Sequence, residues 1–198
     1  MEFSGKKVTV VGTGISGIGA VGLLNAVGAE VVLYDGNEKL KIEDIEKKLG
    51  TYKAEIVLGE LTKELTDSSD LLVISPGVPI DSPVVKAFEA AGVPVWGEVE
   101  LAYAFDKGKV LAITGTNGKT TTTALVGQIV GAYHKDTFVV GNIGNPYTTE
   151  VLKSNKDSYT VAEISSFQLE TVHEFHPLVS AILNITPDHL NRHYTMDC

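Results

Sequence analysis

Short apolar runs rich in β-branched residues recur along the chain, and amphipathic stretches separate them. The runs that we expect to be strands are Val8–Val11, Val31–Tyr34, Leu71–Ile74, Val93–Trp96, Val110–Ile113, Phe138–Val140, Tyr159–Ala162 and Ala181–Ile185. Most are apolar at nearly every position, which is typical of strands buried on both faces of a parallel sheet. The order strand–helix–strand therefore predicts an α/β fold with a doubly wound parallel sheet.

The first helix is expected between the first two runs. One buried face is indicated by apolar residues that recur every three positions, namely Ile18, Val21, Leu24 and Val27. Gly28 follows, where a glycine that ends a helix belongs. The charged segment Glu38–Lys48 also has an apolar side, and it predicts a solvated surface helix.

A first glycine-rich loop, Gly12–Gly17, lies directly after the first predicted strand. Its glycines permit a tight turn and a close backbone approach to a phosphate, which the helix N-terminus attracts. Asp35 ends the next strand, 18 residues after Gly17, and is placed to accept a hydrogen bond from a ribose or base. The pattern favours a nucleotide-diphosphate site. The alternative is that the glycines only permit close helix–sheet packing, and the pattern does not separate NAD from other diphosphates.

A second loop, Ile113–Thr120, again lies between a strand and a helix, and its Gly118-Lys119-Thr120 matches the end of a P-loop. In such a loop the backbone N–H groups hold phosphates, the lysine bridges the β- and γ-phosphates, and the threonine binds Mg²⁺. The usual first glycine is replaced by Ile113, and the glycine stands at 115 instead. The alternative interpretation is a threonine-rich helix start.

Two further groups follow later strands. Glu163 comes at the carboxyl end of a strand, where ligands of open α/β sheets bind, and an acid there can hold Mg²⁺ opposite a P-loop. It is alternatively a cap for the helix that starts at Ser165. Asp188 and His189 follow the last predicted strand, so His189 is a candidate metal ligand or substrate contact, although a lone histidine is more often structural.

Composition excludes several classes of protein. The net charge of −9 argues against binding to nucleic acid, which requires a basic patch. The sequence has no apolar run near the ~20 residues that cross a bilayer, and Met1–Lys7 does not resemble a secretory signal. Cys198 is the one cysteine, which excludes an internal disulfide.

We expect a soluble cytoplasmic protein in which one loop holds a nucleotide-linked substrate and the other holds ATP.

These motifs together resemble the Mur ligases. Gly115–Thr120 is similar to the family's Gly-Thr-Asn-Gly-Lys version of the P-loop, which accounts for the displaced glycine. The stretches that resemble the D-glutamate-adding branch of the family are Gly12–Gly17, Ser75–Pro79, Gly97–Leu101, Gly141–Gly144, Glu163–Glu170 and Leu183–Leu190. The resemblance implies a Rossmann-like parallel-sheet domain at 1–106, followed by the first part of a P-loop α/β central domain at 107–198.

The resemblance also implies roles for individual residues. Those implied to bind the UDP-linked substrate are Gly14, Ile15, Ser16, Asp35, Ser75, Pro76, Gly77, Asn142 and Ser165. Those implied to bind ATP are Gly115, Thr116, Asn117, Gly118, Lys119, Thr120 and Thr121. The catalytic residues would be Lys119, Glu163 and His189, with one Mg²⁺ on Thr120 and Glu163 and a second on Glu163 and His189.

The implied reaction joins D-glutamate to UDP-N-acetylmuramoyl-L-alanine, a step of peptidoglycan precursor synthesis, with ATP and Mg²⁺ as cofactors. The alanyl carboxylate attacks the γ-phosphate of ATP and gives an acyl phosphate and ADP. The amine of D-glutamate then attacks the acyl carbon and releases phosphate. The implied partners are these small molecules, without nucleic acid or membrane insertion, and the full-length protein is expected to be a monomer.

The chain also departs from the family pattern. The family is more than twice as long, with a carbamylated lysine beyond His189 and a separate C-terminal ligase domain that we expect to be absent here. Asn191 stands where the family pattern has aspartate. We expect a half-built central sheet with an open edge, a tendency to self-associate, and substrate binding with slow or no turnover. Alternative functions are an NAD-dependent oxidoreductase and a non-catalytic UDP-sugar-binding module.

Overall fold

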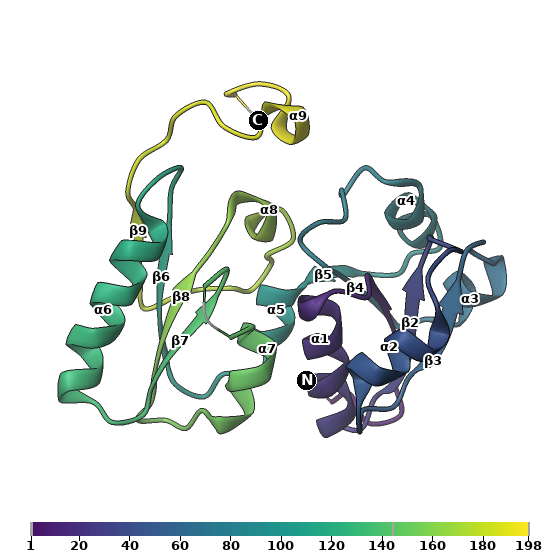
Figure 1. The fold of residues 1–198 in the computed structure, drawn as a ribbon, viewed down its shortest axis with the longest axis horizontal. Helices are drawn as coiled ribbons and strands as arrows, with labels where there is room; N and C mark the ends of the chain where they lie inside the picture. Colours follow the sequence, from purple (N-terminus) through teal and green to yellow (C-terminus); the bar gives the residue numbers. More distant parts are fainter. Residues whose placement is uncertain (1, 144, 198) are drawn as a thin grey trace.

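A computed structural model describes residues 2–143 and 145–197 of the chain. These residues form two separate parallel sheets, which lie side by side in Figure 1. The strands of the first sheet are β1 (Lys7–Val11), β2 (Glu30–Asp35), β3 (Glu55–Leu58), β4 (Leu71–Ile74) and β5 (Val95–Gly97). They are ordered β3-β2-β1-β4-β5. The helices of this half are α1 (Ile15–Ala26), α2 (Ile42–Leu49), α3 (Lys63–Ser68), α4 (Pro83–Ala90) and α5 (Glu98–Tyr103).

The second sheet is ordered β7-β8-β6-β9. Its strands are β6 (Lys109–Thr114), β7 (Thr137–Gly141), β8 (Tyr159–Glu163) and β9 (Val179–Ile182). The helices of this half are α6 (Lys119–Tyr133), α7 (Tyr147–Glu150), which continues as a 3₁₀ turn over Val151–Lys153, α8 (Ser166–Leu169) and α9 (Leu190–His193). The prediction of an α/β fold with parallel sheets is confirmed.

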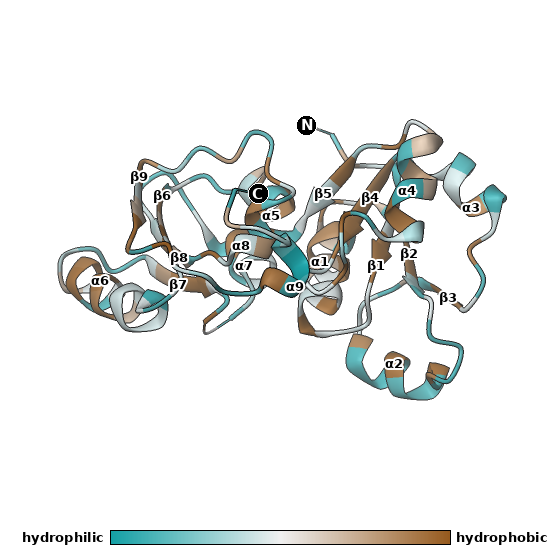
Figure 2. Cartoon of the chain, turned by 90° about the horizontal axis from the view of Figure 1, so that it is seen from above, coloured by the Kyte–Doolittle hydropathy of each residue, from teal (hydrophilic) through white to brown (hydrophobic). Residues whose placement is uncertain are grey.

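Strand β1 shows why the first sheet forms. It lies in the middle, with Val8 opposite Val31 of β2 and Leu71 of β4. Val10 packs into one apolar core and Val11 into the other, because successive side chains of a strand point to opposite faces. Both faces are thus buried, as the apolar runs predict. Figure 2 shows the same concentration of hydrophobic residues along β1, β2 and β4.

Three strands differ from their predictions. The predicted strand Ala181–Ile185 is shifted and is Val179–Ile182 in the structure, because the residues after Ile182 turn toward the P-loop instead of continuing the pairing. The predicted strand at 93–96 is β5, at Val95–Gly97. Strand β3 was not predicted. It is a half-buried edge strand that begins with an exposed glutamate, so its apolar run is short.

The helices match expectation more closely. Helix α1 buries Val21 and Leu24 completely, and Gly28 adopts φ +80° just after the helix ends. Helix α2 covers most of the charged segment predicted to be a surface helix. It buries Ile45 and exposes Ile42, so the apolar side is narrower than the sequence indicated.

Helices α1, α5 and α7 lie between the two sheets (Figure 1). The first sheet ends at Gly97 and the second begins at Lys109, and the predicted domain boundary at 106/107 lies in this connection. That boundary stays a prediction.

The segment that carries α9 makes a second connection between the halves. The Arg192 guanidinium donates to the Val78 carbonyl at 3.0 Å and pairs with Glu170. The Tyr194 hydroxyl donates to Asp81 at 2.7 Å. Figure 1 shows α9, in yellow, above the space between α8 and α4. The chain therefore returns to the N-terminal half after building the second sheet.

Among the described residues, none of the helices has both the length and the apolar character needed to cross a membrane.

Candidate functional site

The glycine-rich loop between β1 and α1 serves both packing and access. Gly12 adopts φ +104°, a conformation that favours glycine. A Cβ atom on Gly17 would lie 1.9 Å from the Gly12 carbonyl oxygen, so this glycine is required for packing. A Cβ atom on Gly14 would meet nothing within 4 Å. Gly14 also precedes α1 without a capping side chain, so the open face of the loop lies beside the helix N-terminus.

Two of the predicted substrate residues lie against this loop. The Thr13 hydroxyl donates to Asp35 at 3.1 Å, and the Asn37 backbone N–H donates to the other Asp35 oxygen at 3.1 Å. The Ser75 hydroxyl oxygen is buried without a hydrogen-bond partner among the described residues, and a Cβ atom on Gly12 would come within 2.7 Å of it. The carboxyl ends of β1, β2 and β4 thus bring the loop, Asp35 and Ser75 together. Pro76 and exposed Gly77 continue directly from Ser75.

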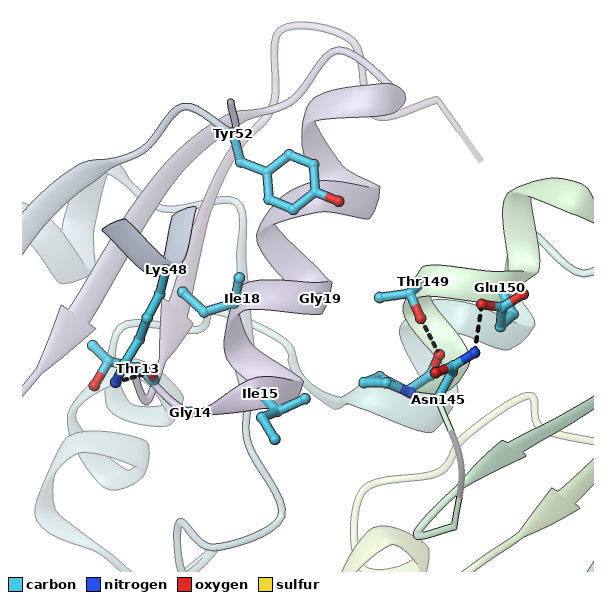
Figure 3. Close-up of a pocket in the computed structure, with 11 residues that line it drawn as sticks. Thr13, Gly14, Ile15, Ile18, Gly19, Lys48, Tyr52, Asn145, Thr149 and Glu150 are labelled. Atoms are coloured by element: carbon cyan, nitrogen blue, oxygen red, sulfur yellow. Dashed lines mark hydrogen bonds between the residues drawn. The ribbon is translucent and has the colours of Figure 1, made fainter. Parts of the chain in front are cut away.

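Figure 3 shows a cavity beside this loop. It has a volume of about 640 Å³ and is lined from both halves of the chain. Thr13, Gly14 and Ile15 line one side, and Asn145 and Pro146 line the opposite side. Ile15 is 79% exposed, so it offers an apolar contact next to the helix N-terminus.

The P-loop connects β6 to α6 as predicted. Gly115 and Gly118 adopt φ values of +139° and +84°, so the displaced glycine at 115 supplies a turn that other residues rarely adopt. The Lys119 ammonium donates to the Gly115 carbonyl at 2.7 Å and to the Thr116 carbonyl at 3.0 Å. Thr120 and Thr121 are exposed in the first turn of α6. The P-loop therefore has a defined conformation, in which Lys119 bonds to carbonyl groups of the loop itself.

Asn184 was not predicted as a site residue, although it lies within a motif that carried the resemblance. Its side chain accepts from the Asn117 N–H at 2.9 Å and donates to the Asn117 carbonyl at 2.9 Å. Its own carbonyl accepts from the Thr116 N–H at 3.0 Å. Asn184 braces the P-loop from the segment after β9. The available signal was an amide just after β9, the strand that pairs with β6.

Glu163 lies at the end of β8, in register with Ile113 of β6 and Gly141 of β7. It is 1% exposed, and its Oε1 accepts from the Asn142 side chain at 3.1 Å. Its Oε2 is buried without a hydrogen-bond partner among the described residues. A buried carboxylate oxygen left unpaired costs free energy, and a hard divalent cation such as Mg²⁺ satisfies it. Glu163 therefore fits the cation predicted beside the P-loop.

The alternative role of Glu163 as a helix cap is wrong. Helix α8 is capped by Ser165, whose hydroxyl accepts from the Gln168 N–H at 3.3 Å. The Gln168 side chain accepts in return from the Ser165 N–H at 2.9 Å, which completes a capping box. The implied substrate role of Ser165 stays a prediction.

His189 is exposed and adopts φ +51° at the start of α9. Its ring lies 4.8 Å from the Phe167 ring, and its Nε2 lies 3.7 Å from Asp188. The part of the chain that the structure describes holds no group of three or more His, Cys, Asp or Glu arranged to bind a metal. The second predicted metal position, shared by Glu163 and His189, therefore stays a prediction.

Comparison with known families accounts for both halves of this arrangement. Residues 6–97 match the family described as Mur ligase MurD-like, N-terminal domain, and residues 113–198 match the Mur ligase middle domain. The chain belongs to the Mur ligase family. In this chain the glycine-rich loop lies in the first matched domain, and the P-loop and Glu163 lie in the second.

Several curated Mur ligases match the whole chain. One named UDP-N-acetylmuramoylalanine–D-glutamate ligase, from Lachnospira eligens, is 72% identical over 100% of this chain and 44% of the relative. One of the same name from Lachnoclostridium phytofermentans is 60% identical over 100% of this chain and 44% of the relative. The chain thus spans about 44% of the length of these relatives.

Solved structures show the same fold at low sequence identity. The UDP-N-acetylmuramate:L-alanyl-gamma-D-glutamyl-meso-diaminopimelate ligase of Neisseria meningitides aligns with a TM-score of 0.58 and 18% identity, covering 96% of this chain and 63% of that one. A murein peptide ligase of Psychrobacter arcticus aligns with a TM-score of 0.54 and 18% identity, covering 94% of this chain and 44% of that one. These likenesses confirm the two-domain α/β fold.

Proposed function

We propose that this chain provides the UDP-substrate site and the ATP site of an ADP-forming ligase that joins D-glutamate to UDP-N-acetylmuramoyl-L-alanine. The names of its relatives support the substrates, because the D-glutamate ligases named above match every part of the chain. The chain matches about 44% of those relatives' length, and we propose the complete reaction for a protein that also contains the remaining part. The cytoplasmic location expected from the sequence belongs to this proposal, as does the monomeric state expected for the full-length protein.

The observation that carries the proposal is the buried Glu163 carboxylate in register with the strand that leads into the P-loop. Its unpaired Oε2 suits a cation, and Lys119 supplies a positive charge within the loop itself. A nicotinamide-dependent oxidoreductase needs neither group. The glycine-rich loop and Asp35 alone are compatible with NAD, so the second half of the chain favours the ligase.

In the proposed mechanism the chain binds and orients two anionic reactants. The open face of the Gly14 turn and the N-terminus of α1 receive the UDP diphosphate, while Asp35 accepts a hydrogen bond from the ribose or base. The N–H groups of the P-loop hold the ATP phosphates, and Lys119 exchanges its loop carbonyls for phosphate oxygens. This arrangement brings the alanyl carboxylate in line with the γ-phosphate, and phosphoryl transfer yields an acyl phosphate and ADP. The D-glutamate amine then displaces phosphate from the acyl carbon.

Mg²⁺, when bound, offsets the negative charge that builds up between the carboxylate and the phosphates. Thr120 and Glu163 would hold the first ion, and Glu163 with His189 the second. Asn142 holds Glu163 in place through its side-chain amide, and we propose that it also contacts the muramoyl end of the substrate together with Ser165.

The first test is a calorimetric titration of the purified chain with UDP-N-acetylmuramoyl-L-alanine and, separately, with NAD⁺. We expect saturable binding of the UDP ligand, weakened about tenfold by Asp35→Ala because a hydrogen bond to a charged group is lost. Asp44→Ala is the matched control, since Asp44 is an exposed carboxylate on α2 that pairs only with the neighbouring Lys47 among the described residues. Binding of NAD⁺ in place of the UDP ligand would contradict the proposal.

A second test distinguishes two functions of this chain, namely part of an ATP-dependent ligase and a non-catalytic module that binds a UDP-sugar. A ligase part binds ATP with Mg²⁺, and Lys119→Ala abolishes that binding while leaving the affinity for the UDP ligand unchanged. Retention of UDP binding without any ATP binding by the original chain would favour the module. We expect D-glutamate-dependent ADP release by this chain alone to be slow or undetectable.

A further inference from the structure

Helix α5 carries two glutamates that are almost completely buried. Glu98 is 3% exposed and Glu100 is 1% exposed. Burial of a carboxylate is costly unless hydrogen bonds satisfy its oxygens. No salt bridge joins either of them to a basic side chain within the described ranges. Their partners must therefore explain why two acids lie in the core between the domains.

The partners of Glu100 are backbone N–H groups of the middle domain. Its two oxygens accept from His173 at 2.8 Å, Glu174 at 2.8 Å and Phe175 at 3.2 Å. The same helix adds the Tyr103 hydroxyl, which donates to the His176 carbonyl at 2.9 Å. Glu100 thus binds the segment that follows α8, which is the segment between Glu163 and β9.

The partner of Glu98 lies in a different part of the middle domain. The Tyr147 N–H, at the start of α7, donates to the Glu98 Oε1 at 3.1 Å. Burial raises the pKa of Glu98, and the hydrogen bond from Tyr147 opposes the rise.

The first turn of α7 borders the cavity beside the glycine-rich loop. Pro146, directly before Tyr147, and Thr149 of α7 line this cavity, and Thr13 and Gly14 line its opposite side. The Glu98 carboxylate therefore holds the segment of the middle domain that faces the glycine-rich loop of the N-terminal domain.

We propose that Glu98 and Glu100 divide the fixing of the two domains between them, each holding a different segment of the middle domain, and that Glu98 is a positioning residue for the α7 side of the cavity beside the glycine-rich loop. Glu98 holds the first turn of α7. Glu100 holds the segment after α8. The part that concerns ligand affinity rests on the proposed function, whereas the division of contacts does not.

Hydrogen exchange of the full chain tests this division, and each glutamate is the control for the other. In Glu98→Gln one acceptor oxygen becomes a donor, so we expect the amide of Tyr147 to exchange about tenfold faster. The amides of residues 173–175 should stay as in the parent. Glu100→Gln should give the reverse pattern. Equal acceleration at both places, or no change at either, would overturn the proposal.

Ligand affinity tests the positioning role. We expect Glu98→Gln to weaken binding of UDP-N-acetylmuramoyl-L-alanine about fivefold to tenfold, and Glu100→Gln to leave it within about twofold. Glu98→Asp is a milder variant for the case that Glu98→Gln does not fold, because it keeps the carboxylate on a shorter side chain, and it should weaken binding of the same ligand without changing exchange at residues 173–175. Unchanged affinity in both Glu98→Gln and Glu98→Asp would overturn the positioning role. If the parent chain does not bind UDP-N-acetylmuramoyl-L-alanine, the proposed function is overturned instead. The exchange pattern still tests whether Glu98 and Glu100 hold different segments of the middle domain.

Discussion

Two acidic side chains of the N-terminal domain show how the surroundings set the charge of a residue. Asp70 is exposed, and its carboxylate accepts from the Lys7 N–H at 2.9 Å and from the Lys6 ammonium at 3.0 Å. These donors hold the pKa of Asp70 below its usual value. Glu98 is buried, and desolvation raises its pKa although it also accepts hydrogen bonds. Hydrogen bonding dominates at the surface, and loss of water dominates in the core.

The lowered pKa of Asp70 makes a pH-dependent contribution to stability. Because its pKa is lower in the folded chain than in the unfolded one, the contribution is present above the unfolded value and is lost as the pH falls through the folded value. We expect Asp70→Asn to lower the melting temperature at pH 7 and to match the parent in acid well below pH 3.8. Thermal melts of both proteins between pH 2 and pH 7 measure this.

Asp157→Asn is the control for that experiment, since Asp157 is an exposed aspartate in the turn before β8. If the melting temperature of Asp70→Asn differs from that of the parent by the same amount at every pH, the Asp70 carboxylate does not stabilise the fold through its charge.

At the scale of single elements, the glycine-rich turn separates packing from ligand access. Gly17 contacts the Gly12 carbonyl so closely that a methyl group has no room, while Gly14 faces open space. Both glycines belong to the same sequence pattern, so the pattern alone cannot assign a role to either one.

We expect Gly17→Ala to destabilise the chain by about 2 kcal/mol, because the added carbon meets backbone atoms that cannot move aside without shifting the strand end. Gly14→Ala should leave the free energy of unfolding nearly unchanged and weaken nucleotide binding. Urea unfolding and ligand titration of both variants measure the two effects. Normal nucleotide affinity in Gly14→Ala would mean that the ligand does not approach this face of the turn.

The elements that could be predicted from sequence are those whose local chemistry is distinctive. The P-loop was predictable because Gly115 and Gly118 adopt backbone conformations that favour glycine. Strand β3 could not be recognised, since an edge strand with half-buried residues leaves only a short apolar run. Glu98 and Glu100 gave no signal of burial, because their partners are backbone groups about 50 and 75 residues away along the chain.

At the scale of the whole molecule, apolar side chains are exposed on the outer part of the second sheet. Leu125 and Ile129 of α6 are more than half exposed, and so are Val179 and Ile182 of β9. Within residues 2–143 and 145–197, strand β9 is also an edge of its sheet, with one side unpaired. Unpaired edges with apolar side chains favour association with other chains.

We expect the chain to self-associate through this region in a concentration-dependent way. Ile182→Lys should weaken the association about tenfold, because it removes an apolar contact and places a charge on the edge strand. Sedimentation velocity over a range of concentrations measures this, with Lys156→Gln as a control at an exposed polar position. A parent chain that stays monomeric at high concentration would contradict the prediction.

The return of the chain to the N-terminal domain at α9 has a mechanical consequence. The two domains are attached at α5 and again through Arg192 and Tyr194, and the second attachment lies 114 residues along the chain from its partner Val78. Because the domains are attached at two separate places, one domain cannot rotate freely about α5 relative to the other. Any such rotation must first break the contacts of Arg192 with Val78 and Glu170. Residues that touch neither nucleotide loop therefore help to limit how far the two loops move relative to each other.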